Sequence, residues 1–271
     1  MRDLVRRFPV ISYYAGAVVL SWTYWLTLLA LGLRAGPGTS VSHLPGLLGP
    51  AIAALVVTLI CDGSDGLLRF VRRFWQLPRH PWPVALAIVL PPLLTAVIVL
   101  VQWSLGGPKP ELAQFLLFPG VPESVGPIGM LLAVVILNGF GEEIGWRGFA
   151  TDRLLLRLDP LRATAIVAVL WAFWHVPVFW VNISMAALVG PALVGWLIGL
   201  GLGAFALADL YFRSGRSILA VALWHASYNF AVAVPGAAGL PAAIISTAVM
   251  AWGAYAVWRF WRHPEIAAAT S

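Results

Sequence analysis

Apolar stretches long enough to cross a lipid bilayer recur along the whole sequence and are separated by short polar segments. A transmembrane helix needs about 20 consecutive residues that are mostly apolar. By this criterion the sequence predicts an all-α, polytopic membrane protein with about eight transmembrane helices, which form a single membrane domain over residues 1–271. The predicted spans are residues 9–33, 45–61, 82–104, 125–149, 162–183, 189–211, 217–235 and 240–260.

The first predicted span follows a basic N-terminus and therefore resembles a secretory signal. Its apolar stretch is too long for the hydrophobic region of a signal peptide and long enough to span a bilayer. We expect this segment to be an uncleaved first helix.

Composition supports a membrane protein and argues against a soluble domain or a nucleic-acid-binding protein. Hydrophobic residues make up 61% of the chain and charged residues only 10%, whereas a soluble domain carries about a quarter charged residues. The net charge of +6 would suit nucleic-acid binding, but the positions of the charges favour a membrane, and we expect no nucleic-acid partner. The single cysteine, Cys61, excludes an intramolecular disulfide.

The cations gather toward alternate ends of the predicted spans. Fifteen of the 17 Lys and Arg residues fall on one side of the membrane, and only Arg34 and Lys109 fall on the other. Cytoplasmic loops are enriched in Lys and Arg. We therefore expect a multi-pass protein of the cell membrane, with both termini cytoplasmic and the lipid bilayer as a partner. The basic segment 62–81 is interpreted as a loop that anchors the chain at the interface.

Ionisable residues inside apolar helices are costly and usually mark function. In the fourth span, Glu143 and Arg147 are four residues apart and can pair on one helical face. Glu142 is rotated from Glu143 by about 100° and has no obvious local partner. A charge network at the end of the helix would explain Glu143 and Arg147 equally well, but it explains Glu142 less well.

The fifth and seventh spans carry the other polar candidates. His175 follows Trp171 by one turn and precedes Pro177, which opens the helix because it cannot donate a backbone hydrogen bond. His225 and Asn229 are four residues apart, so both can direct hydrogen-bond donors into one space. Considered singly, each of these residues is more often a packing residue than a catalyst.

Depth in the membrane suggests that these residues meet. Counted from the nearest predicted cytoplasmic arginine, Glu142, His175 and His225 lie at depths of about 16, 20 and 14 Å in continuous helices. The depths agree within about one helical turn. The sequence therefore predicts a single active-site cavity between the fourth, fifth and seventh helices.

Two further patterns in the sixth span have structural interpretations. Gly195, Gly199 and Gly203 repeat at four-residue spacing, which predicts a face for close helix packing. Asp209 precedes Arg213 by four residues, which predicts an ion pair where the helix leaves the membrane.

Taken in order, these motifs resemble those of the CPBP group of membrane proteins. This group comprises CAAX-type prenyl proteases and bacteriocin-processing or immunity proteins, and is also called the Abi family. The resemblance covers residues 125–235, interpreted as a CPBP-like catalytic core. Its motifs are Glu142-Glu143-x-x-x-Arg147, an aromatic residue followed four positions later by His175, and His225-x-x-x-Asn229. One departure is Trp171, where the family more often has Phe.

The resemblance implies a glutamate-type membrane endopeptidase that acts on a membrane-associated peptide or protein. By this resemblance, Glu142 and His175 position and activate a water molecule, and His225 with Asn229 forms the oxyanion hole. Glu143 and Arg147 then take supporting roles. The resemblance implies no cofactor and no metal.

Three alternatives stay open at this point. A zinc protease could use the same Glu and His residues, although the sequence lacks a His-Glu-x-x-His pair on one helix. A non-catalytic membrane adaptor or immunity protein is a second alternative, against which the complete motif set argues. A transporter is a weaker third, because intramembrane acids suit proton relays but no internal repeat is evident.

Overall fold

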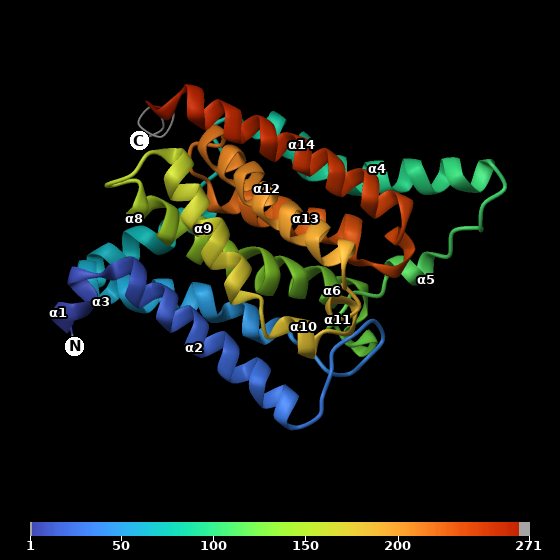
Figure 1. The fold of residues 1–271 in the computed structure, drawn as a ribbon, viewed down its shortest axis with the longest axis horizontal. Helices are drawn as coiled ribbons and strands as arrows, with labels where there is room; N and C mark the ends of the chain where they lie inside the picture. The colour runs from blue at the N-terminus through green and yellow to red at the C-terminus, as the bar shows by residue number, and fades with distance from the viewer. Residues whose placement is uncertain (1, 266–271) are drawn as a thin grey trace.

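The structure, a computed structural model, describes residues 2–265 and consists of helices joined by turns and loops (Figure 1). Within these residues the β-type pairing is limited to one isolated bridge, between Ala35 and Asn182. The predicted all-α class is confirmed. The longer helices are α2 (Pro9–Ala30), α3 (Gly49–Arg72), α4 (Pro81–Ser104), α6 (Gly126–Ala133), α9 (Pro160–Trp174), α12 (Pro191–Arg213), α13 (Ile218–Ala233) and α14 (Leu240–Arg262). The short ones are α1 (Arg2–Arg7), α5 (Leu112–Phe115), α7 (Gly141–Glu143), α8 (Asp152–Leu154), α10 (Val178–Val181) and α11 (Ile183–Ala186).

Six helical segments within residues 2–265 are long and apolar enough to cross a membrane. They coincide with the second to sixth predicted spans and with the eighth. The first and seventh predicted spans correspond to α2, of 22 residues, and α13, of 16 residues, which fall outside that set. The multi-pass membrane architecture is confirmed, and the total of eight crossings stays a prediction.

Helix α3 corrects the predicted boundary between the second span and the loop at 62–81. The helix continues to Arg72, and a 3₁₀ turn over Arg73–Trp75 extends it. Gly63, with φ of 73°, interrupts the helical geometry in a conformation that glycine adopts without steric cost. The helix therefore kinks where the apolar run ends, and its second part carries arginines across the end of the bundle.

The helices form two groups with the fourth and fifth predicted spans between them. Figure 1 shows α2 and α3 side by side on one side of the bundle, with α4, α12, α13 and α14 gathered on the other. Helix α9 packs on α12, and the segment that follows α6 packs on α13. The motif residues of the fourth and fifth spans are therefore enclosed by helices from both halves of the chain.

Side chains of α2 hold the backbone of α9 in place. The Tyr14 hydroxyl donates to the carbonyl of Leu170 over 3.1 Å, and Trp22 Nε1 donates to the carbonyl of Trp174 over 3.0 Å. The Trp174 carbonyl is one of the last four of α9, which lack partners within the helix, so the bond from Trp22 satisfies part of the α9 C-terminus. The first span thereby fixes the part of α9 that leads into His175.

The fourth predicted span is wound more widely than an α-helix over most of its second half. Two π-helical segments, η4 (Val134–Phe140) and η5 (Ile144–Thr151), flank the single α-helical turn α7. Within η5, Thr151 Oγ1 donates to the carbonyl of Trp146, five residues earlier, over 2.9 Å. Gly139 permits this segment to approach α13, because a Cβ there would lie 2.5 Å from the carbonyl oxygen of Ala222.

The predicted glycine packing face on the sixth span is wrong. A Cβ added at Gly195 or Gly203 would meet no atom within 4 Å, and one at Gly199 would meet only the sulfur of Met250, at 3.9 Å. The close approach of α12 to α14 occurs instead at Gly253, where a Cβ would lie 2.1 Å from the carbonyl oxygen of Leu202. Spacing alone does not identify which helix contributes the small residue.

The predicted ion pair of the sixth span is present and is larger than expected. Arg213 Nε lies 2.7 Å from Asp209 Oδ2, and Arg259 of α14 binds the other carboxylate oxygen. Trp252 Nε1 also donates to Asp209 Oδ2, over 2.9 Å. The carboxylate is fully buried, so this cluster connects α12 to α14 and is more than a pair at the membrane exit.

Candidate active site

Glu142 lies on α7, between the two π-helical segments, and its side chain is almost completely buried, with 1% exposure. Trp171 Nε1 donates to its Oε2 over 2.7 Å, and Asn138 Nδ2 donates to its Oε1 over 3.1 Å. The expectation that Glu142 has no local partner is therefore wrong. Asn138 precedes it by four residues on the same helix, and Trp171 reaches it from α9.

Glu143 and Arg147 form the ion pair that their spacing predicts. Arg147 Nη1 lies 2.8 Å from Glu143 Oε1, and the two side chains are 1% and 0% exposed. His225 of α13 places its Nδ1 2.8 Å from the same carboxylate oxygen. Glu143 thus joins the fourth and seventh predicted spans as well as pairing with Arg147.

His175 lies just after the end of α9, within a short turn that includes Pro177. Its Nδ1 is 2.7 Å from the carbonyl oxygen of Trp171. A carbonyl can only accept, so Nδ1 carries the hydrogen, and in the neutral ring Nε2 keeps its lone pair. The rings of Trp171, Trp174 and Trp196 surround the imidazole at centroid distances of 5.5, 4.9 and 5.5 Å.

Asn229 joins the cluster through another amide. Its Nδ2 donates to Asn138 Oδ1, and Asn138 in turn donates to Glu142. A primary amide carries two N–H donors, so one remains after the bond to Asn138. Asn138 therefore lies between Asn229 and the carboxylate, a position that the sequence interpretation did not assign to it.

Trp171, one turn before His175, contacts several other residues of the cluster. Besides its hydrogen bond to Glu142, its ring lies 4.8 Å from the Arg147 guanidinium carbon and 5.7 Å from the His225 ring. A guanidinium over an aromatic face is attracted by the ring quadrupole. One side chain from α9 thus contacts Glu142 and Arg147 of the fourth predicted span and His225 of the seventh.

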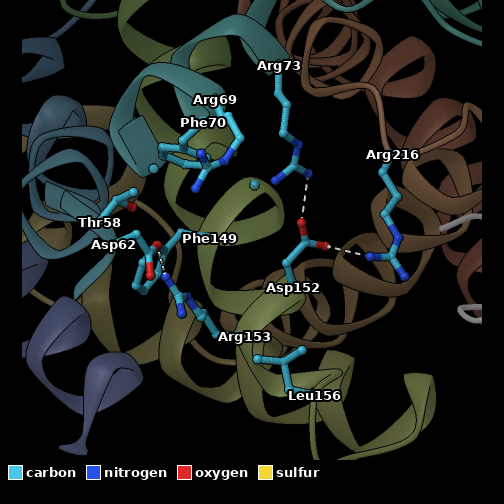
Figure 2. Close-up of a pocket in the computed structure, with 12 residues that line it drawn as sticks. Thr58, Asp62, Arg69, Phe70, Arg73, Phe149, Asp152, Arg153, Leu156 and Arg216 are labelled. Carbon is cyan, nitrogen blue, oxygen red and sulfur yellow. Dashed lines mark hydrogen bonds and ion pairs between the residues drawn. The ribbon is translucent and has the colours of Figure 1, made fainter. Parts of the chain in front are cut away.

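The six candidate residues form one connected cluster, either directly or through one intermediate. Arg147 and His225 both contact Glu143 directly. Glu142 is linked by Trp171, His175 by the Trp171 carbonyl, and Asn229 by Asn138. The pocket drawn in Figure 2 is lined by other residues. The predicted cavity between the fourth, fifth and seventh helices stays a prediction.

Two comparisons with known proteins each find similarity to CAAX prenyl proteases, and the first covers the region that holds this cluster. A family model described as type II CAAX prenyl endopeptidase Rce1-like matches residues 124–231. The chain is 25% identical over 175 residues to a protein named CAAX prenyl protease 2 from Methanococcus maripaludis. That match covers 64% of this chain and 63% of the relative, so the aligned part is less than two thirds of the relative's length.

Proposed function

We propose that this chain is a membrane-embedded endopeptidase of the Rce1-like, type II CAAX prenyl endopeptidase kind, on the strength of the family-model match over residues 124–231 and of the similarity to CAAX prenyl protease 2. The proposed residues are Glu142 and His175 for activation of water, and His225 and Asn229 for the oxyanion. Glu143 and Arg147 support them.

In the proposed reaction Glu142 acts as general base. A water molecule held by Glu142 and by Nε2 of His175 attacks the carbonyl carbon of the scissile bond while Glu142 accepts its proton. His225 and Asn229 donate hydrogen bonds to the oxyanion of the tetrahedral intermediate, a contribution commonly worth ~10²–10³ in rate for each donor. Glu142 then returns the proton to the leaving amine as the C–N bond breaks.

The observation that carries this proposal is the environment of Glu142. Its carboxylate is buried, lies in an apolar helix bundle and faces N–H donors from Asn138 and Trp171. A carboxylate in such a place is costly to bury and usually marks a functional site, and these bonds hold both of its oxygens in defined positions. The His225 ring also contacts the Trp171 ring, with the centroids 5.7 Å apart.

The His225 hydrogen bond adds a requirement to the proposal. Because a carboxylate can only accept, His225 Nδ1 carries the hydrogen in its bond to Glu143. Donation from Nε2 to an oxyanion then requires a second hydrogen on the ring, which makes the imidazole positively charged. Glu143 is suited to hold such a ring, since it offers a negative charge 2.8 Å away.

Zinc does not fit this arrangement of side chains. Two of the four possible ligands, Glu143 and His225, are bonded to each other, and the Arg147 guanidinium occupies the same oxygen of Glu143. Within residues 2–265, no group of three or more His, Cys, Asp or Glu side chains is placed to hold a metal ion. The proposed reaction therefore has no step through a metal, and activity should persist after treatment with a chelator.

The proposed substrate is a membrane-associated peptide or protein. The relative named CAAX prenyl protease 2 suggests a prenylated CAAX tail as the first candidate. We also propose that the protein resides in the cell membrane, with the arginine-rich end of the bundle toward the cytoplasm.

The proposal is tested by substituting Glu142 with Gln and measuring hydrolysis of a farnesylated CAAX peptide by the purified protein. Loss of the general base should slow turnover about 10²–10⁴-fold, with an unchanged melting temperature. Glu111→Gln is the matched control, because Glu111 is an exposed acid outside the cluster. Normal turnover by folded Glu142→Gln would overturn the assignment. If neither the wild-type protein nor the control hydrolyses any membrane peptide, the adaptor alternative is favoured.

A further inference from the structure

A second polar site lies at the end of the bundle, outside the candidate active site. It is a pocket of about 380 Å³ between the extended end of α3, the segment from η5 to α8, and the turn between α12 and α13. Figure 2 shows four arginines and two aspartates around it. The charged lining consists of Arg69, Arg73, Arg153, Arg216, Asp62 and Asp152.

The cations in this pocket outnumber the acids by two. Asp152 lies between Arg73, at 2.7 Å, and Arg216, at 3.6 Å, and so serves two guanidinium groups with one negative charge (Figure 2). Asp62 is paired with Arg153. Arg69 is exposed and forms no ion pair with any residue in 2–265. The pocket is therefore electropositive in its resting arrangement.

The backbone around Arg216 is shaped to keep this residue in the pocket. Arg216 has a φ of 60° and follows Gly215, whose φ is 74°. A positive φ in a residue other than glycine is uncommon and costs free energy. It persists here with the Arg216 amide donating to the carbonyl of Tyr211 over 2.7 Å. The strained turn directs an arginine to the pocket, and strain of this kind gathers at functional sites.

Apolar side chains complete the lining. Phe70 and Phe149 form one wall, and Leu156 stands at the rim with 75% of its surface exposed. The pocket thus combines guanidinium groups with apolar surface at the level where the apolar helices end. Guanidinium groups bind phosphate oxygens through paired hydrogen bonds, and basic pockets between transmembrane helices hold lipid headgroups.

We propose that this pocket binds a phosphate group, presented either by the headgroup of an anionic membrane lipid or by a soluble phosphate. Arg69 contacts the phosphate, and Arg73, Arg153 and Arg216 are held beside it by Asp152 and Asp62. The proposal is independent of the peptidase assignment, because none of the proposed catalytic residues lines the pocket.

The test measures the melting temperature of the purified full-length protein in a neutral detergent at low salt. Phosphatidylglycerol, phosphatidylcholine and inorganic phosphate are titrated separately. A ligand that binds the folded state raises its stability with concentration, so the titration gives an apparent affinity. The variants are Arg69→Gln and Arg72→Gln, which remove the same charge from neighbouring positions on α3, but only Arg69 lines the pocket.

We expect phosphatidylglycerol to stabilise the wild-type protein saturably, and Arg69→Gln to weaken its apparent affinity about fivefold, the loss expected for one arginine near a charged headgroup. Arg72→Gln should match the wild type. Inorganic phosphate that stabilises equally well, with the same dependence on Arg69, would support a soluble phosphate as the ligand, whereas a response to the lipid alone supports the headgroup. Equal responses of the two variants, or equal stabilisation by phosphatidylcholine and phosphatidylglycerol, would overturn the proposal.

Discussion

A single side chain, that of Trp171, contacts several members of the proposed active site. Its N–H holds Glu142, its ring packs against Arg147 and His225, and its carbonyl accepts from His175. A hydrogen bond to a charged acceptor in a poorly hydrated place is stronger than one in water. Trp171 is therefore a positioning residue for the proposed base.

Trp171→Phe keeps an aromatic ring but removes the N–H donor. We expect kcat to fall about 10- to 100-fold, because a bond of this kind contributes about 1.5–3 kcal/mol, with a much smaller change in KM. The matched control is Trp174→Phe, three residues later on the same helix. Trp174 is equally buried, but its Nε1 has no hydrogen-bond partner among the described residues. Equal losses of kcat in the two variants would show that only ring volume matters.

The two adjacent acids should respond differently to the loss of charge. Glu143→Gln leaves both Arg147 and His225 without their anionic partner in a buried place. Breaking a buried ion pair by removing one partner typically costs about 3–5 kcal/mol. We expect a clear fall in the melting temperature for Glu143→Gln, measured beside Glu142→Gln as the comparison. An unchanged melting temperature in Glu143→Gln would contradict this account of the ion pair.

The sequence could predict the contacts that depend on spacing within one helix. The pair of Glu143 and Arg147 follows from a separation of four residues, and the same rule applied toward the N-terminus would have found Asn138 beside Glu142. The bond from Trp171 to Glu142 could not be predicted, since it depends on how α9 is rotated relative to α7. No pattern within a single helix defines that rotation.

At the scale of helices, the apolar runs predicted the positions of the helical segments well. The predicted end of the second span and the predicted packing face of the sixth span were wrong. The helix α3 continues past Cys61 because its second part lies across the end of the bundle, where polar residues are favourable. The predicted span therefore ended at residue 61, where the apolar run ends, although the backbone remains helical to Arg72. The prediction also placed the packing glycines on α12, whereas the close approach occurs at Gly253 of α14. A regular glycine spacing does not show whether another helix covers that face.

The contact between α12 and α14 provides a test at this scale. Gly253→Ala places a methyl group against the backbone of Leu202, so the helices must separate, and we expect a destabilisation of about 1–3 kcal/mol. Gly203→Ala is the control, because its methyl group would meet no atom within 4 Å and alanine favours helices by up to about 1 kcal/mol. Unfolding in a denaturing detergent would rank the two variants. Greater damage from Gly203→Ala would restore the glycine face to α12.

For the whole molecule, the arrangement of the chain ends agrees with an even number of crossings. Figure 1 places α1, α8 and the C-terminal end of α14 at the same end of the bundle. These elements carry six of the fifteen arginines on which the predicted orientation depends, namely Arg2, Arg6, Arg7, Arg153, Arg259 and Arg262. The side of the membrane that this end faces stays a prediction from the cation asymmetry.

Cysteine labelling tests that orientation. Arg157→Cys and Lys109→Cys place an exposed thiol at opposite predicted sides, in a background where the partly buried Cys61 is replaced by Ala. A membrane-impermeant maleimide added to intact cells should label Lys109→Cys only, and both variants should react after the cells are opened. Labelling of Arg157→Cys from outside would reverse the predicted orientation.

The hydrogen bonds from α2 to α9 bear on whether the segment that matches the family model can function without the N-terminal helices. The family match begins at residue 124, yet two carbonyls of α9 are satisfied by Tyr14 and Trp22, more than a hundred positions upstream. The segment that matches the family model therefore depends on contacts from outside it. A fusion or truncation that retains only residues 124–231 would keep the acids and histidines but would lack the Trp22 donor to the Trp174 carbonyl, next to His175. We expect a separately expressed N-terminal fragment that contains α2 to restore function to such a truncated protein.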